Sequence, residues 1–126
     1  MLLKNAKVVD GSFETIAADL VVSGETIERI CAPGAANDET AYDLTGCTIL
    51  PGFIDMHIHG CAGADTGDAT PEALEAMSAL LAKEGITSFC PTTMTLPEEE
   101  IARILANVKA CMEKGLPGAY PQGVNM

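Results

Sequence analysis

The only two histidines of this 126-residue chain, His57 and His59, stand one residue apart in the stretch PGFIDMHIHG. Residues 53–59 predict a β-strand, because this apolar run follows a proline and a glycine. Side chains of a strand alternate between its faces, so both imidazoles and the carboxylate of Asp55 are expected to point the same way. Two neutral imidazoles on one face can bind the same divalent ion. His57 and His59 are therefore the candidate metal ligands.

Alternatives to a metal site stay open. A lone histidine on an apolar strand is more often a satisfied core or surface residue, and a metal site needs more than two ligands. The chain has no third histidine to supply. Asp55, Asp65 and Asp68 offer carboxylate oxygens, with Asp55 expected to support the histidines and the other two to be loop residues. No catalytic residue is predicted within the chain itself.

Cysteines and threonines are the other residues with chemical potential. The five cysteines are widely spaced and lack a C-x-x-C pair, which predicts reduced thiols, mostly buried, in a cytoplasmic protein. Cys61 or Cys90 would be a nucleophile only with a base beside it, and a pair formed by His59 and Cys61 would be an unusual dyad. Three threonines lie at the end of the strand predicted over residues 86–94: Thr92, Thr93 and Thr95. They either line a pocket or make ordinary strand-end hydrogen bonds.

The first 50 residues predict strands and turns. Residues 2–10 and 15–30 are rich in β-branched side chains, and Ser23-Gly24 reads as a hairpin turn between two apolar runs. Residues 31–39 predict a loop from their Pro, Gly, Asn and Asp content, and residues 42–52 predict one or two further short strands.

The pattern changes after Pro51 to strand, helix, strand, helix and strand. Helices are predicted over 70–85 and 96–115 from their apolar spacing and terminal residues, with a strand over 86–94 between them and a third strand beginning at 122–126. Such alternation is typical of parallel sheets, either doubly wound or closed into a (β/α)₈ barrel. A G-x-G-x-x-G after the first strand is absent, which disfavours a dinucleotide fold. A barrel needs roughly 250 residues, so this chain would hold only three of its strands and two of its helices.

Composition excludes several partners. The formal net charge is -11, from 18 acidic and 7 basic residues, which argues against nucleic acid and anionic membranes. Lys4 and Lys7 interrupt the apolar start, so residues 1–12 lack the core of a signal peptide. No apolar run approaches the roughly 18 residues of a membrane span. A cytoplasmic location is expected.

The quoted motifs carry a family resemblance. ILPGFIDMHIHG resembles the first barrel strand of the amidohydrolase superfamily, in which an H-x-H pair contributes metal ligands. GCAGADTGDATPEALEAMSALLAKEGITSFCPTTMT and the final GVNM resemble the N-acetylglucosamine-6-phosphate deacetylases in particular. The resemblance is strong over residues 48–95 and weak before residue 47. Some relatives that hydrolyse cyclic amides carry an arginine two residues after the second histidine, where this chain has Cys61.

The resemblance implies an α/β fold, with residues 1–50 forming part of a small β-sandwich and residues 51–126 the first β/α units of a TIM barrel, cut short. It matches His57 and His59 to the H-x-H ligands of a divalent metal ion (zinc, iron or manganese). In the family a Glu after GVNM, later histidines, a general acid/base Asp and the phosphate-binding residues complete the site, and these would lie beyond Met126.

The activity that the resemblance implies is removal of the acetyl group from N-acetylglucosamine 6-phosphate, giving glucosamine 6-phosphate and acetate. Its partner would be a small sugar phosphate, and the protein is expected to be a homo-oligomer. Residues 1–126 alone are expected to be inactive. The alternatives are an amidohydrolase acting on another amide and a non-catalytic α/β fragment or assembly module.

Overall fold

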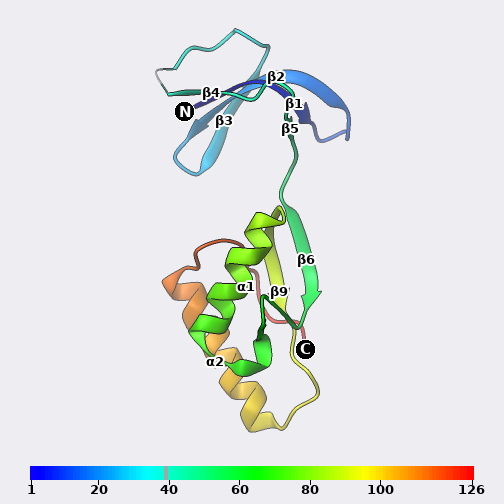
Figure 1. The fold of residues 1–126 in the computed structure, drawn as a ribbon, viewed down its shortest axis with the longest axis vertical. Coiled ribbons are helices and arrows are strands. Elements are labelled where there is room, and N and C mark those ends of the chain that lie inside the picture. The colour runs from blue at the N-terminus through cyan, green and yellow to red at the C-terminus, as the bar shows by residue number, and fades with distance from the viewer. Residues whose placement is uncertain (39) are drawn as a thin grey trace. The chain divides into compact units, whose positions relative to one another are not determined.

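A computed structural model describes residues 1–38 and 40–126 of the chain (Figure 1). These residues divide into two compact units, Met1–Pro51 and Gly52–Met126. The division falls one residue after the predicted boundary. That residues 1–50 belong to a sandwich domain and residues 51–126 to a truncated barrel domain stays a prediction.

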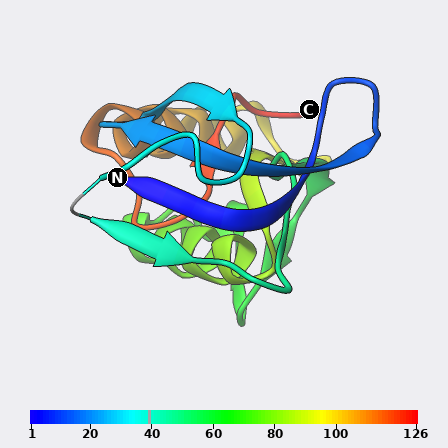
Figure 2. The ribbon, with the colours of Figure 1, turned by 90° about the horizontal axis from the view of Figure 1, so that it is seen from above.

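The first unit is one five-stranded sheet. Its strands are β1 (Leu2–Val9), β2 (Thr15–Ser23), β3 (Thr26–Cys31), β4 (Ala41–Asp43) and β5 (Thr48–Ile49). Strand β1 pairs antiparallel with β2, which pairs antiparallel with β3, and β1 pairs in parallel with both β4 and β5. Figure 2 shows β1, in dark blue, between β2 and β4. The strands predicted before residue 50 are thus present.

Two details of this unit follow from local chemistry. The hairpin turn is Gly24-Glu25, one residue later than predicted, because Ser23 still pairs with Thr26. Gly24 has a φ of 57°, a conformation that glycine adopts without steric cost. Of the loop predicted over residues 31–39, Cys31 is the last residue of β3, residues 32–38 contain no helix or strand, and Glu39 lies outside the described residues.

The second unit contains a parallel three-stranded sheet in the order β10-β9-β6. Its elements are β6 (Phe53–Ile58), the short pair β7 (Gly60–Cys61) and β8 (Ala64–Asp65), the 3-10 helix η1 (Thr66–Asp68), α1 (Pro71–Lys83), β9 (Ile86–Pro91), α2 (Glu98–Lys114) and β10 (Tyr120–Pro121). Both long helices lie on the same side of β9 and β6 (Figure 1). No helix in the described ranges is long and apolar enough to cross a membrane.

Both predicted helices form, with ends where the sequence places them. The hydroxyl of Thr70 accepts a hydrogen bond from the Ala73 N–H (3.3 Å) at the start of α1, and Gly85, with a φ of 81°, follows its end. Helix α2 starts after Pro97 without a side-chain cap, and three glutamates occupy its first turn. The apolar stripes of the two helices pack against β9 in a core of Leu74, Met77, Leu81, Phe89, Ile104, Val108, Cys111 and Ala119.

The third strand is displaced from its predicted position. It comprises Tyr120–Pro121 rather than residues 122–126. Gly123, with a φ of 155°, interrupts the regular pairing, yet the backbone still follows β9: Asn125 forms an isolated parallel bridge with Thr92. The Asn125 N–H donates to the Pro91 carbonyl and the Asn125 carbonyl accepts from the Thr93 N–H, both at 3.0 Å. The final residues therefore reach the carboxyl ends of the other two strands.

Candidate metal centre

His57 and His59 lie at the carboxyl end of β6, as predicted: the strand ends at Ile58, between them. Here three residue steps of β6, from Asp55 to Ile58, match two steps of β9, so the strand carries a bulge. The Asp55 carboxylate accepts a hydrogen bond from the His57 N–H at 3.0 Å. Asp55 therefore supports the backbone of one histidine.

The two imidazoles converge. Their Nε2 atoms are 3.3 Å apart, with ring centroids 5.1 Å apart and ring planes at 77°. Two nitrogens at the usual 2.0–2.1 Å from one tetrahedral ion would stand about 3.4 Å apart. The spacing of the Nε2 atoms of His57 and His59 therefore fits two ligands of a single small divalent ion.

His59 is held by its other ring nitrogen. Nδ1 lies 3.2 Å from the carbonyl oxygen of Thr92, which can only accept, so Nδ1 carries the hydrogen and Nε2 of the neutral ring has a free lone pair. Thr92 is itself buried, and its hydroxyl accepts from the Ile58 N–H and donates to the Cys90 carbonyl, both at 3.1 Å. This carbonyl-to-histidine contact is the usual support of a metal-ligating imidazole.

His57 has a different partner. Its Nδ1 lies 3.3 Å from the side-chain nitrogen of Asn125, which also donates to the Met56 carbonyl at 3.1 Å. Sequence reasoning missed Asn125 because nothing in GVNM marks it as a partner of a histidine 68 residues earlier. The only available signal was its place at the end of the third predicted strand, since parallel strands bring their carboxyl ends to one edge.

The donor set within the described residues is incomplete. No group of three or more His, Cys, Asp or Glu among residues 1–38 and 40–126 is arranged to hold a metal ion. Asp65 and Asp68 cap η1 instead: Asp65 accepts from the Gly67 N–H at 2.7 Å, and Asp68 accepts from the Asp65 N–H at 2.9 Å. The expectation that both are loop residues was wrong, because Asp65 ends β8 and Asp68 ends η1. The histidine pair fits an ion but supplies only two ligands.

The geometry disfavours a cysteine nucleophile. The Cys61 thiol contacts the Met77 carbonyl (3.9 Å) and packs against the core, and burial, aided by the negative charge of Asp55, raises its pKa. A raised thiol pKa reduces the fraction of reactive thiolate.

All five cysteines are free, but the expectation that most are buried was wrong: Cys111 is buried, Cys47 is exposed, and the other three are half-buried.

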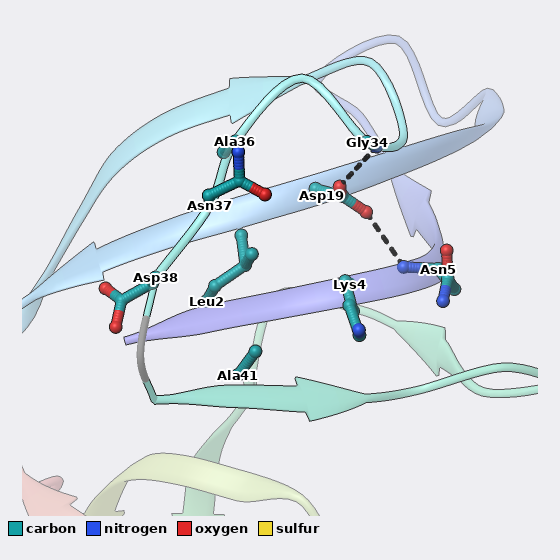
Figure 3. Close-up of a pocket in the computed structure, with 9 residues that line it drawn as sticks. All are labelled: Leu2, Lys4, Asn5, Asp19, Gly34, Ala36, Asn37, Asp38 and Ala41. Atoms are coloured by element: carbon teal, nitrogen blue, oxygen red, sulfur yellow. Dashed lines mark hydrogen bonds between the residues drawn. The ribbon is translucent and has the colours of Figure 1, made fainter.

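Cavities lie away from the histidine pair in both units. One of about 240 Å³ is lined by Thr93, Met94, Thr95, Leu96, Ile101 and Met126, so two of the three predicted threonines line a pocket. Thr92 does not, because its hydroxyl joins β6 to β9. A cavity of about 260 Å³ in the first unit surrounds the buried Asp19 (Figure 3). Its carboxylate accepts from the Asn5 and Gly34 N–H groups at 2.8 and 2.7 Å, so Asp19 serves the fold there.

Known proteins resemble the chain. The model of the amidohydrolase family matches residues 48–122. An N-acetylglucosamine-6-phosphate deacetylase of Bacillus subtilis is 46% identical over 81 residues, covering 62% of this chain and 20% of its own length. A dihydroorotase of Desulforapulum autotrophicum is 32% identical over 127 residues, covering 95% of this chain and 28% of its own length. The chain thus spans between a fifth and a third of these relatives.

Solved structures agree. The crystal structure of an N-acetylglucosamine-6-phosphate deacetylase from Pasteurella multocida superposes with a TM-score of 0.84 at 28% identity, covering 94% of this chain and 32% of that one. This similarity confirms the predicted fold class, the first β/α units of an amidohydrolase barrel preceded by part of a small β-sandwich. On the family match, which spans more than half of its residues, the chain belongs to the amidohydrolase family.

Proposed function

We propose that the protein carrying this chain is a metal-dependent hydrolase that removes the acetyl group from N-acetylglucosamine 6-phosphate, yielding glucosamine 6-phosphate and acetate. The amidohydrolase family generally consists of metal-dependent hydrolases. The substrate is inferred from the deacetylases of Bacillus subtilis and Pasteurella multocida that the chain resembles. Because the chain spans about a fifth of the first of these relatives, the activity belongs to the whole protein and is not assigned to residues 1–126 alone.

His57 and His59 are the proposed ligands for a zinc, iron or manganese ion. The single observation that carries this proposal is the 3.3 Å separation of their Nε2 atoms. The ion supplies Lewis acidity, which polarises an amide carbonyl and makes a water molecule more acidic. The chain's own part is positioning: Thr92 holds His59 through Nδ1, and Asp55 holds the His57 backbone. The other ligands and the carboxylate that moves the proton to the departing amine are proposed to come from outside residues 1–126.

Acetate release tests the proposal. The full-length protein, loaded separately with zinc, iron or manganese, is incubated with N-acetylglucosamine 6-phosphate, and acetate is measured by a coupled assay. Release that a chelator abolishes and metal restores is the expected result. Unphosphorylated N-acetylglucosamine is the matched substrate control. Absence of acetate with all three metals would refute the proposed activity.

Hydrolysis of a cyclic amide is the second candidate. It is favoured by the dihydroorotase of Desulforapulum autotrophicum, which aligns over 95% of this chain. Against it, Cys61 stands where such relatives carry an arginine for a substrate carboxylate, and its thiol faces the core and the Met77 carbonyl. Incubation of the same preparation with dihydroorotate separates the two: ring opening without acetate release would favour this candidate.

A non-catalytic role as a fragment or assembly module is the third. It predicts neither hydrolysis nor stoichiometric metal in the full-length protein.

The deacetylase proposal also includes a sugar phosphate as partner, a homo-oligomeric assembly and a cytoplasmic location. The oligomer is checked by sedimentation of the full-length protein.

A further inference from the structure

Asn125 and the two histidines form a continuous series of polar contacts that links the C-terminal segment to the ends of β6 and β9. The side-chain nitrogen of Asn125 lies 3.3 Å from His57 Nδ1, His57 Nε2 lies 3.3 Å from His59 Nε2, and His59 Nδ1 lies 3.2 Å from the Thr92 carbonyl. The positions of the ring hydrogens in this series of contacts can be assigned from its two ends. At each end a backbone carbonyl, which can only accept a hydrogen bond, fixes which atom is the donor.

The first end is the Asn125 amide. The atom 3.1 Å from the Met56 carbonyl must be a donor, because a carbonyl only accepts, and this identifies it as the amide nitrogen rather than the oxygen. Its second hydrogen faces His57 Nδ1. His57 Nδ1 must then be an acceptor, which places the hydrogen of the neutral ring on Nε2.

The second end is the Thr92 carbonyl. It accepts from His59 Nδ1, so His59 Nε2 bears a lone pair and can accept the hydrogen of His57 Nε2. Every contact in this series then pairs one donor with one acceptor. Without a metal ion, the two histidines satisfy each other in two different tautomers.

An ion held by both Nε2 atoms needs both lone pairs. His59 presents its lone pair already, but His57 would have to move its hydrogen to Nδ1, where that hydrogen would meet the Asn125 NH₂ group. Two donors would then face each other, so the amide must turn over or withdraw, and its hydrogen bond to Met56 must be lost.

We propose that Asn125 is a positioning residue that sets the tautomer of His57 and thereby makes metal binding by the pair compete with a closed hydrogen-bonded state. The part that concerns metal rests on the proposed role of the pair as ligands. His59 is the preset ligand and His57 the switched one. The segment that carries Asn125 therefore responds to occupancy of the metal site.

The tautomers are measured directly in the metal-stripped full-length protein labelled with ¹⁵N-histidine, using long-range ¹H–¹⁵N correlation spectra. His57→Gln and His59→Gln variants assign the signals. The expected wild-type result is a hydrogen on Nε2 of His57 and on Nδ1 of His59. In Asn125→Asp the carboxylate can only accept, so the His57 hydrogen should move to Nδ1. A wild-type His57 with its hydrogen on Nδ1, or an unchanged tautomer in Asn125→Asp, would overturn the proposal.

Gln122→Glu is the matched control. It makes the same change from amide to carboxylate on the same segment, but the Gln122 side chain donates to the Ser88 hydroxyl (3.1 Å) and not to a histidine. Its histidine tautomers should equal those of the wild type. Asn125→Ala removes the donor without adding charge, and it should leave His57 as a mixture of tautomers.

Zinc affinity, measured by competition with a chromogenic chelator, tests the coupling to metal. Asn125→Asp should bind zinc about tenfold or more tightly than Gln122→Glu, because an accepting partner on the ligand's other nitrogen changes metal affinity by roughly 10–100-fold. Asn125→Ala should bind about fivefold more tightly than the wild type, the equivalent of one ordinary hydrogen bond. Equal or weaker binding by both variants would overturn the coupling.

The two proposals fail separately. Should the wild type bind no zinc through His57 and His59 while the tautomers are as stated, the proposed metal site fails and the assignment to Asn125 stands. If the wild type binds zinc but its His57 carries the hydrogen on Nδ1, the metal site stands and the role assigned to Asn125 fails. Thermal melts of each variant confirm that the protein remains folded.

Discussion

The Nε2 atoms of His57 and His59 lie 3.3 Å apart. The surroundings of the two side chains differ. His59 is half-buried and held by the carbonyl of the buried Thr92, whereas His57 is exposed and faces an amide. Neither ring belongs to the apolar core of the second unit. The pair thus takes no part in packing that core.

Replacing both histidines by glutamine should lower metal content without unfolding the full-length protein. Each lost imidazole removes a proposed ligand, so zinc affinity should fall by at least about tenfold, the lower end of what even a supporting residue contributes. Metal analysis after dialysis and a thermal melt measure the two effects. Gln122→Ala, on the segment beside the site, is the control. Unchanged metal content and rate in the double variant would make the pair structural.

Thr92→Val should destabilise the fold. Thr92 is buried and its hydroxyl accepts from the Ile58 N–H, so valine leaves this half-buried donor without its partner, at a cost of about 1 kcal/mol. Denaturant unfolding measures the loss. Thr95→Val is the matched control, because Thr95 is exposed, and it should change stability by no more than about 0.5 kcal/mol. Equal stabilities of the two variants would show that the contact between the strands contributes nothing.

Cys111 should be the slower thiol in alkylation, and Cys47 the faster. Burial raises the pKa of the Cys111 thiol, the nearby Glu75 carboxylate raises it further, and only the Lys114 ammonium opposes them. A raised pKa means less thiolate at any given pH, so labelling of Cys111 should keep increasing with pH above the ordinary thiol value of about 8.5. Cys47 is exposed.

Mass spectrometry of native protein pulsed with iodoacetamide between pH 7 and 10 measures both sites. Equal labelling of Cys111 and Cys47 at neutral pH would contradict the burial and the raised pKa together.

Residues 1–126 produced alone should be inactive and should self-associate. The edge strand β6 exposes Phe53, Ile54 and Met56 by 60%, 63% and 72%, and an apolar edge strand is a template for pairing with another chain. Two proposed metal ligands without further donors among the described residues do not make a hydrolytic site. Sedimentation velocity and an acetate assay test both statements. A monomer with a cooperative melt would show that these exposed residues need no cover.

Sequence alone determined the elements whose signals are local. Helix α1 begins and ends near the predicted residues, because Thr70, Pro71 and Gly85 act within one turn of their own position. The placement of His57 and His59 at a strand end was also predictable, since it needs only the period of a strand and the position of its last residue.

Tertiary structure alone decided what meets the two histidines. Asn125 and the Thr92 carbonyl approach them from positions 68 and 33 residues away, and no local pattern encodes such distances. The bulge between Asp55 and Ile58 is likewise a property of two strands in register. Local sequence sets backbone preferences through nearest-neighbour sterics and hydrogen bonds. Which donor faces which ring nitrogen depends on how parallel strands align, and that alignment comes from packing over the whole unit.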